Sequence, residues 1–246
     1  MKKPSLFFVL SLLIVLTACK KKDTAPAPAG SSGNTSVTYY GTLSAQRLVT
    51  NLFPPSVDTS YNCNAYFYSN AVTVKYNYMP NSLVNAGNVL IDGIQTKFQS
   101  NYYADTTGML SLKNLVNWSV TGGGAVPSLS YSYTPVWPNY ANPNLLPDTI
   151  RLGQNNILQL SGMTNVDQVV ISLFNPSTGA AAGTGLSSIG ANTNYTFSSG
   201  SLSAFTSGST AYLAVIMYNP VSDQTFGGKK FFFYNQYTYY KGVYVK

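Results

Sequence analysis

Alternation of apolar and polar residues at every second position is the feature that most constrains the fold of this chain. From Val72 to Tyr78, valine and tyrosine occupy the even positions and polar residues the odd positions, as expected for a strand with one buried face. Turn sequences such as Asp92–Gly93, Asn175–Gly179 and Asn219–Asp223 punctuate the chain. Between turns, further strand-like runs lie at residues 64–68, 88–91, 115–120, 129–133, 156–160, 168–174, 211–218, 230–234 and 237–245.

Helical periodicity is almost missing after residue 37. Short helical turns are expected only at residues 45–51 and 202–205. Many short strands separated by turns are typical of antiparallel sandwiches. The chain is therefore predicted to be all-β.

Prolines divide the predicted strands into two groups. Pro135, Pro138, Pro143 and Pro147 fall in a short stretch, and proline at this density opposes both helix interiors and sheet ladders. We expect two immunoglobulin-like β-sandwich domains, residues 37–135 and 148–246, joined by a proline-rich linker at 136–147. The alternative is one larger sandwich with a long proline-rich connection.

The amino terminus has the layout of a secretory signal. Lysines at positions 2 and 3 precede an apolar run from Leu6 to Leu16. As a helix, this run rises about 16 Å, well short of the roughly 30 Å of a bilayer's hydrocarbon core. It is therefore predicted to be a signal peptide and not a membrane span.

The residues that end this segment, Leu16-Thr17-Ala18-Cys19, resemble the lipobox of bacterial lipoproteins. The resemblance implies that residues 1–18 are removed by cleavage between Ala18 and Cys19, and that Cys19 carries the acyl chains that hold the protein on a membrane. The alternative is an ordinary secretory signal whose cleavage site falls beside a cysteine.

The residues after Cys19 bear on localisation. Lys20 stands where an aspartate marks retention at the inner membrane in some lipoproteins, so the resemblance implies the outer membrane. The run Lys20–Asp23 resembles surface-export signals of Bacteroidota lipoproteins and favours surface exposure over a periplasmic position. A basic patch beside anionic headgroups explains the same lysines. Small and polar residues dominate 24–36, so residues 19–36 are predicted to form a lipidated, disordered tether.

Several short phrases of the remaining chain resemble uncharacterised cell-envelope lipoproteins of Bacteroidota. These phrases are Asn117–Val120 with the glycines at 122–124, Leu146–Ile150, Asn165–Val169 and Gly228–Phe231. They consist of turn and core residues. The resemblance therefore supports the localisation and implies no particular chemistry.

Composition excludes most catalytic sites. The chain has no His, its acidic residues are all Asp, and it has only two Cys. It also lacks Ser-x-x-Lys, Gly-x-Ser-x-Gly and Asp-Thr/Ser-Gly motifs, so neither catalytic residues nor a cofactor are expected. The candidate carboxylates of a remote alternative, an Asp-dependent hydrolase, fall mostly in predicted turns; they are Asp58, Asp92, Asp105, Asp148, Asp167 and Asp223.

The sequence also argues against metal and nucleic-acid binding. No Asp-x-Asp-x-Asp loop occurs, so no metal site is expected. Only Lys229 and Lys230 are adjacent cations after residue 37, so no basic track for phosphates is expected. Once Cys19 is acylated, Cys63 has no partner for a disulfide and is expected to be a buried apolar thiol.

The chain is rich in tyrosine and asparagine, which suit sugar rings and protein epitopes. Trp118 alternates with valines and is expected in the core, whereas alternation does not assign Trp137 and Tyr140. These two are the candidate binding surface; the alternative is packing between domains. We therefore expect a non-catalytic, membrane-anchored binding or adhesion module for a glycan or protein partner, and alternatively a structural subunit of an envelope complex.

Overall fold

The computed structural model describes residues 37–53, 56–73, 76, 83–112, 114–183, 187–188 and 194–246. The predicted signal peptide, Cys19 and the predicted tether lie outside these residues. The described residues belong to one compact unit, 36–246. In this part of the chain, no helix has the length and apolar character needed to cross a bilayer.

The described chain is nearly all β, which confirms the predicted class and its sandwich character. Its strands are β1 (Tyr39–Leu52), β2 (Ser56–Val72), β3 (Val89–Ile91), β4 (Ile94–Gln95), β5 (Lys97–Gln99), β6 (Tyr102–Ala104), β7 (Val116–Val120), β8 (Leu129–Tyr133), β9 (Asn139–Tyr140), β10 (Thr149–Ile150), β11 (Asn156–Gln159), β12 (Met163–Thr164), β13 (Gln168–Phe174), β14 (Ala181–Gly183), β15 (Ser187–Ser188), β16 (Asn194–Phe197), β17 (Thr210–Phe226) and β18 (Lys229–Val245). Two 3-10 turns, η1 (Pro143–Leu145) and η2 (Gly200–Leu202), complete the described elements.

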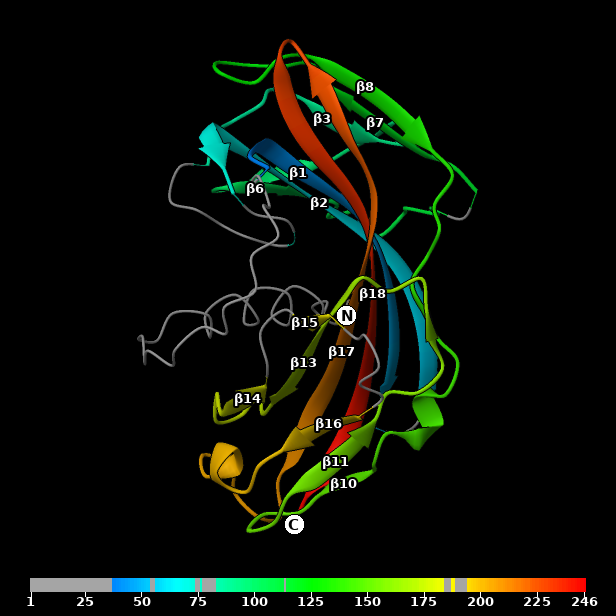
Figure 1. Ribbon diagram of the computed structural model, residues 1–246, viewed down its shortest axis with the longest axis vertical. Coiled ribbons are helices and arrows are strands. Elements are labelled where there is room, and N and C mark those ends of the chain that lie inside the picture. The colour runs from blue at the N-terminus through cyan, green and yellow to red at the C-terminus, as the bar shows by residue number, and fades with distance from the viewer. Residues whose placement is uncertain are drawn as a thin grey trace, which may run out of the picture. The chain divides into compact units, whose positions relative to one another are not determined.

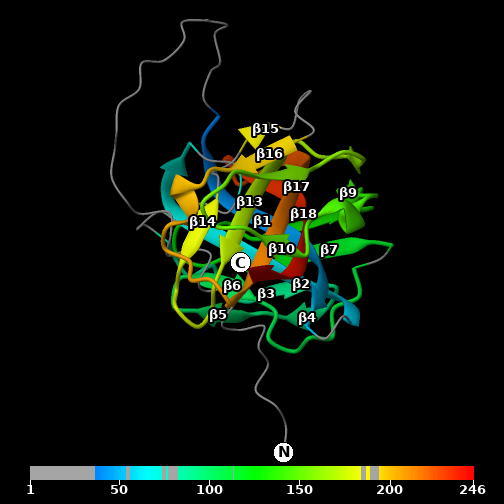
Figure 2. The same cartoon turned by 90° about the horizontal axis from the view of Figure 1, so that it is seen from below.

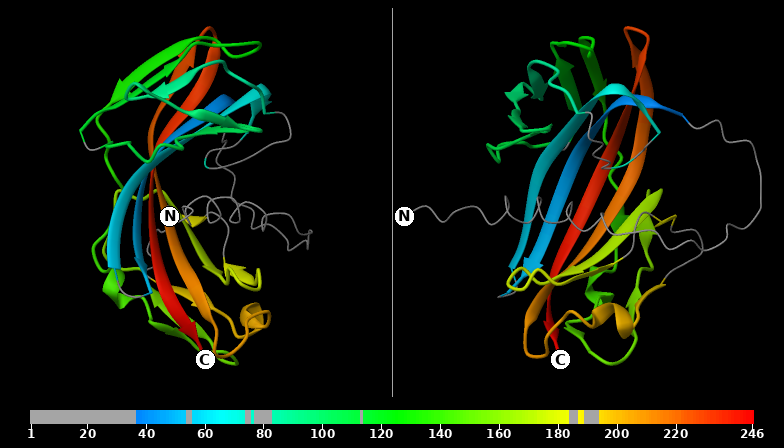
Figure 3. Two further views of the ribbon diagram at one scale, coloured as in Figure 1. Left: turned by 180° about the vertical axis from the view of Figure 1, so that it is seen from behind. Right: turned by 90° about the vertical axis from the view of Figure 1, so that its left-hand side faces the viewer.

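Four long strands form the centre of the fold (Figure 1). The main sheet has the order β14-β13-β17-β18-β1-β2-β6-β5, in which β1 and β18 are parallel and β1 and β2 antiparallel. Figure 2 shows β13, β17, β18 and β1 side by side from below, and Figure 3 shows how the long strands curve. At about 3.3 Å per residue, β17 and β18 each extend roughly 55 Å.

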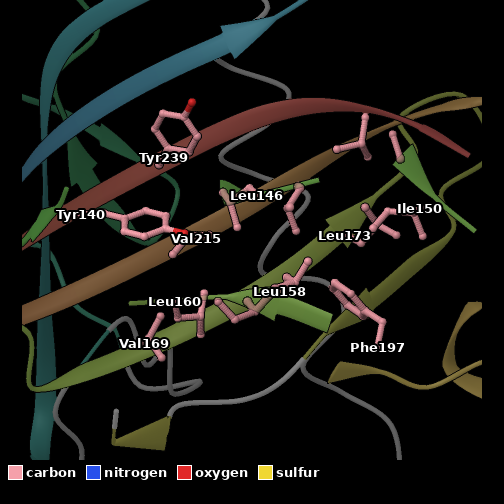
Figure 4. Packing of buried hydrophobic residues seen from close by; sticks show 14 of the residues in the cluster. Tyr140, Leu146, Ile150, Leu158, Leu160, Val169, Leu173, Phe197, Val215 and Tyr239 are labelled. Atoms are coloured by element: carbon pink, nitrogen blue, oxygen red, sulfur yellow. The ribbon is translucent and has the colours of Figure 1, made fainter. Parts of the chain in front are cut away.

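Two hydrophobic cores lie along these strands. The first, here the β7–β8 core, joins β1, β2 and the start of β18 to β3, β7 and β8; it includes Leu43, Cys63, Phe67, Trp118, Phe231 and Phe233. The second, here the β11–β13 core, joins the end of β18 to β11, β13, β16 and β17; it includes Leu158, Ile171, Phe197, Val215, Tyr239 and Val243. Figure 4 shows side chains of the second core.

The boundaries predicted at residues 135 and 148 do not divide the main sheet. β1 begins in the first predicted domain, yet eleven of its residues, Gly41 to Asn51, pair with β18 of the second. β18 supplies Phe231 to one core and Tyr239 to the other. Each core takes residues from both sides of the predicted linker, and the two cores share one continuous sheet.

Three local predictions are wrong. Residues 45–51, expected as a helical turn, belong to β1 and lie between two long strands. The turn expected at Asn219–Asp223 is part of β17, and a bulge between Pro220 and Ser222 accommodates the proline. The separate runs at 230–234 and 237–245 form the single strand β18.

Other predictions agree with the structure. The runs at 129–133 and 168–174 are β8 and β13. At Asp92–Gly93 the chain turns with φ of 49° and 77°, and η2 includes Leu202 of the helical turn expected at 202–205. The alternating run 72–78 falls mostly outside the described residues: β2 ends at Val72, and only Thr73 and Tyr76 are described beyond it.

Candidate binding surface

The proline-rich segment crosses the main sheet where the two cores meet. The backbone carbonyl of Val136 accepts hydrogen bonds from Nδ2 of Asn219, at 2.8 Å, and from Nδ2 of Asn235, at 3.1 Å. The next carbonyl, that of Trp137, accepts one from Asn165 Nδ2 at 3.4 Å. Three asparagine side chains thus fix this short stretch of backbone across the sheet.

Asn235 is the fully buried member of this arrangement. Its Oδ1 accepts a hydrogen bond from the Tyr133 hydroxyl at 3.1 Å, while its Nδ2 donates to the Val136 carbonyl. Asn235 pairs with Asn219 across β17 and β18, so two amides of one cross-strand pair bind the same carbonyl. A buried amide is stable here because both of its ends have partners.

Arg47 lies two residues further along the sheet than this crossing, because Asn235 pairs with Ala45 and Tyr237 pairs with Arg47. It pairs with Tyr61 of β2 and with Tyr237 of β18, so the three side chains form a row on the face that carries the cores. The guanidinium carbon stands 5.3 Å from the centroid of the Tyr237 ring, within cation–π range. Arg47 and Tyr61 are partly exposed, and Tyr237 is buried.

Trp137 packs against the Tyr61 end of this row. Its ring centroid is 5.9 Å from that of Tyr61, with the two planes inclined by 56°. Trp137 is partly exposed and packs against the edge of the β7–β8 core. The four residues Arg47, Tyr61, Trp137 and Tyr237 are called the arginine–aromatic cluster below.

Tyr140 does not share this surface. It is 3% exposed, lies in the β11–β13 core (Figure 4), and faces Tyr239 edge-on at 6.5 Å. Its hydroxyl donates to the carbonyl of Gln159 at 2.5 Å. Of the two residues predicted as a binding surface, the structure leaves Trp137 accessible and buries Tyr140, because short β9 turns its tyrosine into the core.

The electrostatics of Tyr237 reflect its neighbours. Burial raises the pKa of the Tyr237 hydroxyl, and the positive charge of Arg47 works in the opposite direction. The ring is therefore neutral at ordinary pH and presents its π face to the guanidinium.

The carboxylates are held separately. Asp92 accepts from the backbone N–H of Asn117 at 2.8 Å, and Asp105 accepts from that of Thr107 at 2.7 Å. The Asp105 bond closes a local turn, as the sequence indicated.

Two further carboxylates bind tyrosine hydroxyls. Asp167 accepts from Tyr76 at 2.6 Å and Asp223 from Tyr39 at 3.1 Å. Within the described residues, no group of three or more metal-binding side chains occurs. Each of these carboxylates therefore has a structural partner of its own.

The remaining candidate groups are structural. Cys63 is free and fully buried in the β7–β8 core, as predicted, and burial raises the pKa of its thiol. Trp118, also predicted in the core, is 1% exposed. Lys241 is buried, donates to the Leu146 carbonyl and forms an ion pair of 2.8 Å with Asp148.

The sequence matches no known protein family, and no curated protein matches it either. Sequence reasoning missed Arg47 because residues 45–51 were expected to be helical, and it missed Tyr61 because the nearest strand-like run was placed at residues 64–68 and not over the full length of β2. Ala45, Arg47 and Val49 alternate along β1, and this alternation was the available signal.

Proposed function

We propose that this protein is a lipid-anchored lipoprotein of the outer membrane whose folded part is a non-catalytic binding module for a glycan or protein partner. The anchor is Cys19, and the folded part faces the cell exterior. The lipobox-like segment that ends at Cys19 supports the lipid anchor, and Lys20 after it supports the assignment to the outer membrane. The tether of small and polar residues gives the folded part reach beyond the membrane surface.

The binding role depends on one observation, the arginine–aromatic cluster. Trp137 and Tyr61 leave part of each ring accessible beside the guanidinium of Arg47. Accessible tryptophan, tyrosine and arginine side chains are the groups most often found at the centres of binding surfaces. By contrast, four of the candidate carboxylates accept structural hydrogen bonds and a fifth, Asp148, pairs with Lys241, which favours a non-catalytic role; the four are Asp92, Asp105, Asp167 and Asp223.

The anchoring is tested by replacing Cys19 with alanine in the full chain. Because acylation precedes cleavage in lipoproteins, we expect C19A to accumulate as unprocessed precursor and to lose lipid labelling. A matched variant, C63A, removes the buried thiol and keeps normal processing. Unchanged processing and membrane association of C19A would contradict the lipoprotein proposal.

Exposure is tested by adding protease to intact and to lysed cells. Degradation of the folded part on intact cells supports the surface position, whereas protection until lysis places it in the periplasm and contradicts adhesion. Binding is tested by presenting neutral glycans, acidic glycans and matrix proteins to the purified full chain. We expect Trp137→Ala to weaken binding and Tyr244→Ala, a more exposed aromatic at the end of β18, to leave it unchanged.

A second candidate, a structural subunit of an envelope complex, is favoured by the edge of β2. β1 covers one edge of residues 56–62, and in the described part of the chain no ladder covers the other edge. Such an edge can accept a strand from a partner. Lysine on an edge strand opposes such pairing. Ser60→Lys should therefore abolish chemical cross-linking of this protein to an envelope partner, whereas Ser130→Lys, at an exposed position of β8, should retain it. No cross-linked species in the wild type would contradict this candidate.

A further inference from the structure

We infer that the arginine–aromatic cluster binds an acidic saccharide, with the carboxylate of a uronic-acid unit on Arg47 and the sugar ring against Trp137 and Tyr61. This inference deepens the proposed binding function and depends on it. It adds the ligand class and assigns a role to each side chain.

The charge of Arg47 has no acidic partner within the described residues. The one ion pair there joins Lys241 to Asp148. The Nε of Arg47 is buried and makes no hydrogen bond, while the side chain as a whole keeps partial exposure. Because Nε is enclosed by protein, an incoming carboxylate would approach the accessible part of the guanidinium and not Nε.

The geometry of a guanidinium suits a carboxylate. Its planar fork can donate two parallel hydrogen bonds to the two oxygens of one carboxylate, and these charge-assisted bonds are about twice as strong as neutral ones. Arg47 is supported from one side by the Tyr237 ring at 5.3 Å. This contact limits the rotamers of the long side chain, so less conformational entropy is lost on binding.

The two accessible rings favour a sugar as the rest of the ligand. Trp137 and Tyr61 stand 5.9 Å apart and inclined by 56°, and together they offer an angled apolar wall with polar tips. A pyranose has apolar C–H faces and polar hydroxyl rims that match such a wall. The amides of Asn165 and Asn219 hold the crossing segment in place from beside this wall, by donating to the carbonyls of Trp137 and Val136.

The number of cations near the cluster favours a saccharide with one carboxylate over polyphosphates and nucleic acids. The nearest other cation along β18, Lys241, is four residues from Tyr237, but it is buried and paired with Asp148. Strong binding to a polyanion needs a series of cations along its backbone. A single arginine between aromatic rings fits one carboxylate on one sugar.

The test measures binding of an oligogalacturonate to the purified full chain in detergent. The matched ligand is the same oligosaccharide with its carboxylates methyl-esterified, which keeps the rings and removes the charge. We expect the acidic form to bind and the ester to bind about tenfold or more weakly, in line with loss of a charge-assisted pair. Added salt should weaken the acidic form only.

Substitutions test which side chain contacts the carboxylate of the ligand and which contacts the sugar ring. Arg47→Gln should weaken the acidic ligand by about tenfold or more, whereas Lys97→Gln removes an exposed cation from β5 and should leave affinity unchanged. Trp137→Ala should weaken both ligand forms. Thermal unfolding of each variant checks that the fold is intact, and Arg47→Lys should restore only part of the affinity because it lacks the fork.

The outcomes separate this inference from the proposed function. Equal binding of acid and ester, with both lost in Trp137→Ala, overturns the carboxylate assignment and leaves a glycan-binding module. Binding of a protein partner without any uronic-acid ligand overturns the saccharide inference and keeps the binding function. Failure of oligogalacturonate to bind the wild type at millimolar concentration also overturns the inference, while binding of no glycan or protein ligand contradicts the proposed function itself.

Discussion

Replacing Asn235 with leucine tests how the crossing segment is held. The two side chains have similar size, so the change removes two hydrogen bonds from a fully buried position with little change in volume. The Val136 carbonyl keeps its bond from Asn219, but the Tyr133 hydroxyl, in a residue 8% exposed, loses the acceptor of its proton.

The expected loss follows from these contacts. A neutral hydrogen bond contributes about 1 kcal/mol net, and an unpaired buried polar group costs about 1–3 kcal/mol. We therefore expect N235L to lower the free energy of unfolding by about 3 kcal/mol. For a unit of this size, that corresponds to a fall in Tm of roughly 6–12 °C.

A double-mutant cycle with Tyr133→Phe identifies the cause. Since the phenylalanine has no hydroxyl to leave unpaired, Y133F should destabilise N235L by about 1–2 kcal/mol less than it destabilises the wild type. Both variants and their combination are measured by denaturant unfolding monitored by fluorescence. An N235L protein within about 0.5 kcal/mol of the wild type, or strictly additive effects, would refute the reasoning.

Three further predictions concern single sites. Gly41→Ala should destabilise by about 1–3 kcal/mol, because its new Cβ would lie 2.8 Å from the Tyr66 carbonyl oxygen, whereas Gly200→Ala, with open space around it, should not; denaturant unfolding compares them. Cys63 should resist alkylation in the native state and react on unfolding, as followed by mass spectrometry, since burial keeps it a thiol. Burial raises the pKa of Tyr140 to about 12 from the ordinary value of 10.0, so its contribution to stability is complete below pH 10.0 and is lost as pH rises towards 12; Tyr140→Phe should flatten that part of the stability profile.

The sequence predicts best where local pattern and tertiary structure agree. β13 follows its predicted bounds because its alternation matches a strand whose alternate residues Val169, Ile171 and Leu173 all face one core. β18 was divided in two because Asn235 and Gln236 interrupt an aromatic run. In the structure these polar residues continue the strand, because their side chains find hydrogen-bond partners that lie far away in the sequence.

The candidate site was also only partly predictable from the sequence. Trp137 was identified from its setting among prolines, without a partner. Arg47, which completes the cluster, lies 90 positions earlier in a segment that a local pattern assigned to a helix. The pairing of β1 with β18 brings Arg47 beside Tyr237, and the asparagine contacts bring Trp137 over Tyr61. Such contacts depend on long-range register, which composition and periodicity do not encode.

The shared sheet leads to a prediction about cooperativity. Two domains joined by a linker unfold separately when few contacts connect them. Here β18 contributes to both cores, and it is paired with β17 from Thr210 to Phe226 and with β1 from Gly41 to Asn51. Loss of either core therefore exposes strands that the other core needs.

We expect a single calorimetric transition in which the van't Hoff and calorimetric enthalpies agree. Trp118 lies in the β7–β8 core, so tryptophan fluorescence and the calorimetric transition of the whole unit should report the same midpoint. Gly41→Ala, which perturbs the β7–β8 side, should lower both midpoints together. Two resolved transitions, or a shift confined to one probe, would mean that the cores are independent despite the common sheet, and the predicted division near residues 136–147 would then describe how the protein unfolds.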